Sequence, residues 1–125
     1  MRTPPNWIVA GAVVGFLAVA LGAFGAHGLE KHATSEGMAW WETGVRYHLV
    51  HAPVLLLLGL LPLRGRDRIG WLFLLGILVF SGTLYAMALG APRWFGAITP
   101  LGGLALLGGW ALLAWQGRRL APRGP

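Results

Sequence analysis

Four long apolar stretches divide the chain, with polar or turn-forming residues between them. They cover residues 7–26, 45–63, 69–89 and 96–115. A helix of about 20 mostly apolar residues crosses the hydrocarbon core of a bilayer, so each stretch is long enough to span a membrane. None of them alternates between apolar and polar positions, as the strands of a membrane barrel do. The pattern therefore predicts four membrane-spanning α-helices, which satisfy their own backbone hydrogen bonds in lipid.

The connections between these stretches differ in length. Residues 64–68 and 90–93 form short links, which make neighbouring helices antiparallel. The long connection, residues 28–44, contains Trp40 and Trp41, whose amphipathic rings favour the membrane interface. Thr34 or Ser35 is placed to cap a helix beginning near Glu36. We expect an interfacial helix in residues 28–44, and the pattern allows it to run unbroken into the second span. Residues 116–125 are predicted to be a flexible tail.

The first stretch also has features of a cleaved signal peptide. Arg2 precedes it, and the small residues between Gly22 and Ala26 resemble a cleavage site. Its apolar run is longer than the hydrophobic region of such peptides usually is. We therefore interpret it as the first span of a single membrane domain, residues 1–125.

Composition supports a membrane protein and excludes other classes. Hydrophobic residues make up 56% of the chain and charged residues 11%, against about 25% charged in soluble domains. A soluble domain, a disordered chain and a nucleic-acid-binding domain are excluded on this ground. The ten Lys and Arg stand against four acidic residues, and they lie in short clusters between the apolar runs. Anionic lipids at the bilayer surface are thus the expected partner. The chain has no cysteine, so disulfides and thiolate chemistry are absent.

The distribution of Lys and Arg predicts the orientation in the membrane. One side would carry Arg2, Arg64, Arg66, Arg68, Arg118, Arg119 and Arg123, and the other Lys31, Arg46 and Arg93. Positive residues accumulate on the cytoplasmic side, so both termini are expected there and residues 28–44 on the opposite side. Trp7, Trp71 and Trp115 would then lie at the cytoplasmic interface.

Four motifs occur along the chain in a characteristic order. They are GAFGAHG at residues 22–28, ETGVRY at 42–47 followed by His51, FSGTLY at 80–85, and TPLGG at 99–103. Together they resemble the YgdD-like family of small inner-membrane proteins, a domain of unknown function. The resemblance implies a four-span protein of the cell membrane. It implies no activity, substrate or catalytic residue.

Polar side chains gather in one half of the predicted spans, on the side opposite the termini. This candidate polar site comprises His27, His48, His51, Ser81, Tyr85 and Thr99. Ionisable groups within a membrane usually face the bundle interior. We expect His51 to point inward and to form a hydrogen bond with the first or third helix, at Tyr85 or near His27. Two interpretations stay open: a structural hydrogen bond, or a site for a proton, metal ion or lipid headgroup. No spacing of a known zinc site is present, so no metal or cofactor is predicted.

Three further patterns concern ion pairing and packing. Glu42 and Arg46 are four residues apart, the favourable order for a helical ion pair; the alternative partner of Arg46 is a lipid phosphate or carboxylate ligand. Small residues at close spacing let helices approach, within the bundle or between subunits. They are Gly11, Gly15, Gly22 and Gly25 in the first span and Gly102 and Gly103 in the fourth. Pro53 and Pro100 are expected to bend their spans.

The sequence therefore predicts an all-α, integral membrane four-helix bundle with antiparallel neighbours. The favoured function is a non-enzymatic scaffold or accessory subunit, which pairs with itself or with another membrane protein. The alternative is a protomer that binds or transports a small ligand, ion or lipid through the polar half. A third interpretation is a membrane enzyme that acts on lipid or quinone through His51, although no nucleophile–base pair supports catalysis.

Overall fold

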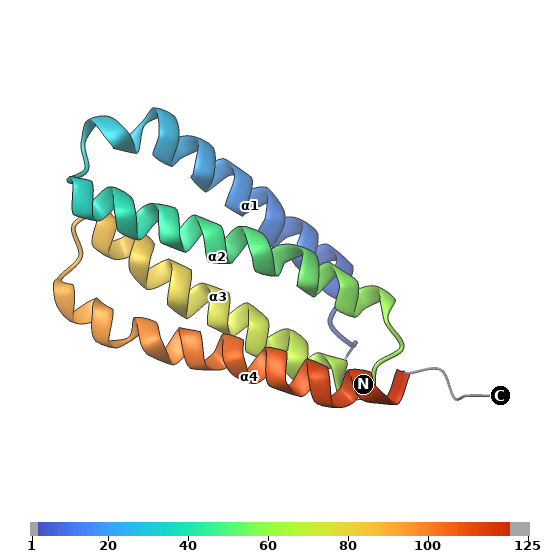
Figure 1. Cartoon of the computed structure of the whole chain (residues 1–125). Helices are drawn as coiled ribbons and strands as arrows, with labels where there is room; N and C mark the ends of the chain where they lie inside the picture. Colours follow the sequence, from blue (N-terminus) through green and yellow to red (C-terminus); the bar gives the residue numbers. More distant parts are fainter. Residues whose placement is uncertain (1–2, 121–125) are drawn as a thin grey trace.

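The computed structural model describes residues 3–120 and contains four long helices (Figure 1). They are α1 (Trp7–His27), α2 (Ser35–Leu60), α3 (Arg66–Ala88) and α4 (Thr99–Gly117). Short 3₁₀ helices η1 (Leu29–Lys31), η2 (Arg93–Ala97) and η3 (Arg118–Leu120) flank them. All four long helices are long and apolar enough to cross a membrane, which confirms the predicted all-helical membrane fold.

The long helices lie beside one another in the order of the chain. α1 packs against α2, α2 against α3 and α3 against α4, and neighbouring helices run antiparallel (Figure 1). α1 and α4 therefore form the two edges of the arrangement. The start of α1 and the end of α4 lie at one end, which we call the terminal end. The opposite end, with residues 28–34 and 89–98, is called the far end.

The helix boundaries follow local capping chemistry. The Asn6 side chain accepts a hydrogen bond from the backbone of Val9 and so caps α1. Thr34 caps α2 in the same way, through the backbone N–H of Gly37 at 3.0 Å. The segment before the second apolar stretch and that stretch itself thus form one continuous helix. At the other end of the chain, helix runs through Leu120, and the rest of the predicted tail, residues 121–125, lies outside the described residues.

The two prolines occupy different positions in their helices. Pro53 lies inside α2, where its missing N–H leaves the Leu49 carbonyl without its helical donor. Pro100, expected inside a span, instead occupies the first turn of α4. Since the first N–H groups of a helix have no helical acceptor, proline costs no hydrogen bond there. The change from η2 to α4 falls just before Pro100, within the apolar segment Arg93–Leu120.

The core lies towards the terminal end and includes a tryptophan expected at the interface. Trp7 is 2% exposed and packs with Leu55, Ile69 and Phe73. Its indole Nε1 donates to Asp67 Oδ1 at 2.7 Å, which links the first turn of α1 to the first turn of α3. Gly70 leaves room for the ring, because a Cβ there would overlap the indole. Trp7 is thus covered by protein, with its ring 5.6 Å from that of Trp71, whereas Trp71 and Trp115 are exposed.

Candidate functional site

His51 is buried in the bundle and joins α2 to α4. Its Nε2 accepts a hydrogen bond from Trp110 Nε1 at 3.0 Å, and its Nδ1 lies 2.6 Å from the Tyr47 carbonyl oxygen. The ring is 4% exposed. The expected inward orientation is present, but the partner is on α4 rather than on α1 or α3. Trp110 was missed because it stands among leucines, and only its indole N–H marks it as a donor.

These two contacts define the tautomer of His51. The indole N–H is a donor only, so Nε2 must carry the lone pair. Nδ1 then carries the proton and donates it to the Tyr47 carbonyl. Both ring nitrogens are satisfied only in this neutral form, because a protonated ring would set an N–H of His51 against the N–H of Trp110. His51 is thus held by the protein at both nitrogens.

His48 and Ser81 form a second set of polar contacts, between α2 and α3. His48 Nδ1 lies 2.9 Å from Tyr85 Oη. Ser81 Oγ donates to the Gly44 carbonyl oxygen at 2.7 Å, and Ser81 is 1% exposed. Tyr85 also packs against Gly44, where a Cβ would lie 2.8 Å from the phenol ring. His48, rather than His51, is therefore the histidine that meets Tyr85.

The remaining candidate polar residues lie in two separate places. Thr99 Oγ1 is 2.6 Å from Thr83 Oγ1, a contact that joins α3 to α4. His27 is the last residue of α1 and is exposed at the far end. The structure thus distributes the candidates over distinct helix pairs instead of gathering them around one chamber. In residues 3–120, no group of three or more His, Asp or Glu is arranged to hold a metal ion.

The glycines predicted to pack helices differ in how closely they approach a neighbour. A Cβ on Gly11 would lie 2.5 Å from the Leu56 backbone nitrogen of α2, and one on Gly102 would overlap the Phe80 backbone of α3. Gly25 is similarly tight against the Trp41 ring. Looser contacts surround the other three, Gly15, Gly22 and Gly103, at 3.6, 3.3 and 3.8 Å from the nearest side-chain atom.

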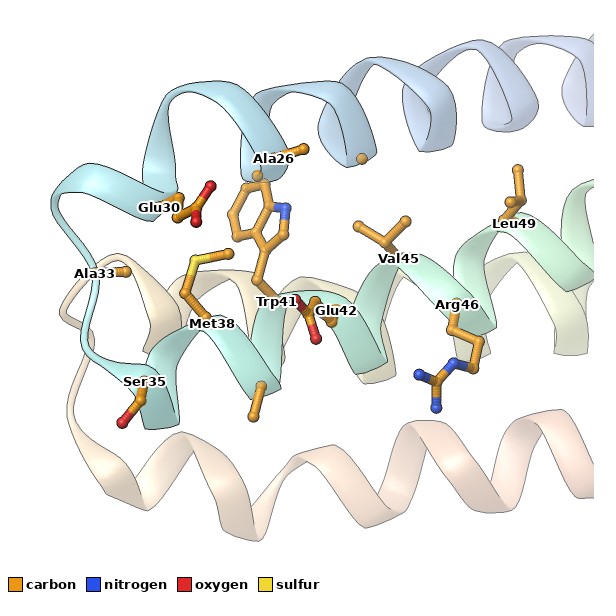
Figure 2. Close-up of a pocket in the computed structure, with 13 residues that line it drawn as sticks. Ala26, Glu30, Ala33, Ser35, Met38, Trp41, Glu42, Val45, Arg46 and Leu49 are labelled. Carbon is orange, nitrogen blue, oxygen red and sulfur yellow. The ribbon is translucent and has the colours of Figure 1, made fainter.

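A groove runs between the far half of α1, η1 and the first half of α2, with a volume of about 920 Å³. Met38, Trp41, Val45 and Leu49 project from α2 towards α1 and form its wall (Figure 2). A second groove of about 490 Å³ continues between α1 and α2 and shares Leu49 with the first. Its lining is almost entirely apolar and includes Gly15, Val19 and Pro53.

Three charged residues border the first groove: Glu30 from η1, and Glu42 and Arg46 from successive turns of α2. Figure 2 shows the Arg46 side chain extending from the edge of α2, away from α1. Within the described part of the chain, none of the three forms a salt bridge. The predicted Glu42–Arg46 ion pair is not formed in this structure. The pair that is formed joins Arg93 to Glu36, with an N–O distance of 2.8 Å, where η2 meets the first turn of α2.

Four apolar helices with buried, hydrogen-bonded polar side chains define a multi-pass α-helical membrane protein. A family described as "Protein of unknown function (DUF423)" matches residues 21–103. The chain belongs to this family, and the resemblance seen in its motifs is confirmed.

Relatives match over nearly the whole chain. The UPF0382 membrane protein YwdK of Bacillus subtilis is 43% identical over 112 residues, which cover 86% of this chain and 91% of that protein. The UPF0382 inner membrane protein YgdD of Escherichia coli K12 is 39% identical over 123 residues, covering 94% of this chain and 92% of YgdD. A UPF0382 membrane protein of Staphylococcus haemolyticus is 42% identical over 112 residues, or 86% of this chain and 90% of the relative. No solved structure matches the chain.

These relatives confirm the localisation and are silent on chemistry. Their names place them in the membrane, and the name of YgdD specifies the inner membrane. Together with the four spans, this makes the chain a multi-pass protein of the cell membrane. Neither the family description nor the names of the relatives indicate a reaction.

Proposed function

We propose that this protein is a non-catalytic scaffold or accessory subunit of the membrane, which acts through the surfaces of its helices. The observation that carries the proposal is the state of its buried polar groups. His48, His51 and Ser81, the buried polar residues, each hydrogen-bond within the bundle. Among the described residues, the single buried side-chain N or O atom without a partner is Gln116 Oε1, in the last turn of α4.

This closed network argues against transport or catalysis in the polar half. A proton carrier or ion ligand needs a side chain that exchanges partners, and such groups in membranes usually line a water-filled cavity. His51 instead uses both nitrogens within the protein. Hydrogen bonds between membrane helices contribute about 0.6 kcal/mol each on average, so the network adds to stability and fixes which helices meet.

Ion flux tests the absence of transport. The purified protein is reconstituted into liposomes, and the uptake of protons, Na⁺ and K⁺ is followed with trapped dyes. We expect rates equal to those of empty liposomes for the parent and for His51→Gln. Flux that exceeds the empty control and falls in His51→Gln would overturn the proposal.

Photo-crosslinking tests the scaffold role. A crosslinking residue is placed in native membranes at Phe16 of α1 or Leu104 of α4, which are 73% and 63% exposed on the two edge helices. We expect a protein adduct of defined mass from at least one edge, either a second copy or another membrane protein. Position Phe73, which is 0% exposed, is the matched control. Adducts with lipid alone from both edges would contradict a scaffold role.

We also propose that both termini lie in the cytoplasm. The start of α1 and the end of α4 lie at one end, as an even number of spans requires (Figure 1). The excess of Lys and Arg at that end favours the cytoplasm, where anionic lipids would bind them. Reporters fused to either terminus should therefore be active only in the cytoplasm, and a reporter active outside it would reverse the orientation.

A further inference from the structure

The two grooves follow each other along α1 and α2 on the side of the bundle, apart from the closed polar network. The first groove has a charged rim, and the second is apolar. They meet at Leu49. A ligand that follows both grooves must carry charges at one end and a hydrocarbon chain at the other.

The dimensions match the depth of one leaflet. Arg46 lies at the start of the predicted second span, residues 45–63, and Leu57 lines the apolar groove 11 residues further along α2, or about 16 Å at 1.5 Å per residue. Half of a hydrocarbon core of about 30 Å is about 15 Å. An acyl chain that starts at the level of Arg46 thus reaches the bilayer centre near the end of the apolar groove.

The charges on the rim indicate the headgroup. Arg46 offers a guanidinium, which binds a phosphate through paired N–H donors. Glu30 and Glu42 add two carboxylates, so the rim has a formal charge of −1 and disfavours a headgroup with a net negative charge. None of the three is engaged in a salt bridge in the part of the chain that the structure describes. A headgroup that carries both a phosphate and an ammonium matches the positive charge of Arg46 and the negative charges of Glu30 and Glu42.

The aromatic lining of the groove favours a headgroup with a primary ammonium over one with a quaternary ammonium. A quaternary ammonium has no N–H to donate and is usually bound by the open faces of aromatic rings. Trp41, the aromatic residue of the groove, is 2% exposed, and its Nε1 donates to the Leu21 carbonyl. Phe24 and Tyr85 pack against it, with ring centroids at 5.6 and 4.6 Å, so little of the ring is open to a ligand. A primary ammonium, by contrast, donates three hydrogen bonds and suits the carboxylates.

We propose that the groove between α1 and α2 is a binding site for a zwitterionic phospholipid with a primary ammonium headgroup, a phosphatidylethanolamine. Arg46 binds the phosphate, Glu42 and Glu30 bind the ammonium, and one acyl chain lies along Gly15, Val19 and Pro53. The site is independent of the scaffold role, because it uses none of the hydrogen-bonded groups of the polar network.

Lipid binding to the full-length protein in detergent micelles tests the site. Three probes with identical acyl chains are compared by native mass spectrometry and by quenching of tryptophan with brominated chains: phosphatidylethanolamine, phosphatidylcholine and phosphatidylglycerol. We expect phosphatidylethanolamine to bind about tenfold more tightly than the other two, the factor for one charge-assisted hydrogen bond. Equal binding of all three lipids, or a preference for phosphatidylglycerol, would overturn the proposal.

Variants locate the binding to the groove. Arg46→Gln and Glu42→Gln remove charges from exposed side chains that form no salt bridge, so both should fold, which circular dichroism checks. We expect each to abolish the preference for phosphatidylethanolamine. Arg93→Gln and Glu36→Gln are matched controls at the same end of the bundle, outside the groove, and should retain it. A preference that survives in Arg46→Gln and Glu42→Gln would place the lipid elsewhere and refute the site.

A bulky residue in the apolar part supplies an independent test. Gly15→Leu fills the second groove without meeting backbone, since its Cβ would lie 3.6 Å from that of Ala52. We expect the lipid to bind about tenfold more weakly in this variant, because the leucine side chain occupies the space of the acyl chain. Unchanged affinity would show that no acyl chain follows α1 and α2.

Discussion

The helix pair α1–α2 and the helix pair α3–α4 are both packed through glycines, but the two grooves described above lie along α1–α2. In α3–α4, close approaches occur at Gly102 against Phe80, Gly76 against Leu106 and Gly109 against Phe73. In α1–α2, Gly11 and Gly25 are tight and Gly15 and Gly22 between them are looser, and all four border the grooves. Both helix pairs therefore combine tight glycines with looser ones, such as Gly103 in α4, and the open space lies beside α1–α2.

Polar contacts reinforce this difference. The α3–α4 pair has an internal bond between Thr83 and Thr99, and Trp110 ties α4 to His51 of α2. The far half of α1 is tied through one indole, Trp41, to the Leu21 carbonyl. An edge helix with few cross-links can leave a groove beside it, which is where the lipid site is proposed.

The largest expected effect comes from leucine at a closed glycine. Gly102→Leu places a side chain on the Phe80 backbone and should lower the free energy of unfolding by about 3 kcal/mol, the upper part of the usual range for overpacking. Gly15→Leu, at the looser position of the other pair, should change it by less than about 1 kcal/mol. Denaturant titration in detergent, followed by tryptophan fluorescence, measures both.

Gly103→Leu is the control for Gly102→Leu, because it adds the same side chain one residue away, where a Cβ would lie 3.8 Å from the Phe80 ring. Equal destabilisation by Gly102→Leu and Gly15→Leu would remove the distinction between the two helix pairs.

An intermediate effect is expected at the bond between His51 and Trp110. A double-mutant cycle with His51→Phe, Trp110→Phe and the double variant should give a coupling energy of about 0.6 to 1.7 kcal/mol, as for other hydrogen bonds between membrane helices. Unfolding free energies of the four proteins provide the measurement. A coupling energy near zero would mean that α4 is held by α3 alone.

The smallest effect is expected at the far end, where Arg93 meets Glu36. Their side chains are 79% and 52% exposed, and such ion pairs contribute about 0 to 1 kcal/mol. Glu36→Gln should lower the unfolding free energy by less than about 0.5 kcal/mol at low salt and by nothing at high salt. A larger loss that persists in salt would show that this ion pair is important for holding η2 against α2.

The sequence predicted the fold well because length and hydropathy are properties of single segments. The four spans, the capping of α2 by Thr34 and the inward position of His51 all follow from local pattern. The partner of His51 does not follow from local pattern, because it depends on the rotation of α4 about its axis. A leucine-rich helix gives little indication of which side faces its neighbours.

The grooves were beyond sequence reasoning for a related reason. Gly11 and Gly15 look equivalent in the sequence, four residues apart on one helix. Their contacts differ because Gly11 faces the α2 backbone at Leu56 and Gly15 faces the side chain of Ala52. Both glycines line the second groove, and the course of the two helices decides how closely each approaches α2.

The bond between Trp7 and Asp67 has a consequence for the order of events during synthesis. The two residues are 60 positions apart, so the acceptor for the Trp7 indole emerges roughly 3 to 12 s after its donor at about 5 to 20 residues per second. Gly70, which makes room for the ring, comes later still. During that interval, α1 and α2 can already pair through Gly11, while Trp7 still faces lipid or the interface. The beginning of the chain therefore reaches its final environment only after the third helix has been inserted.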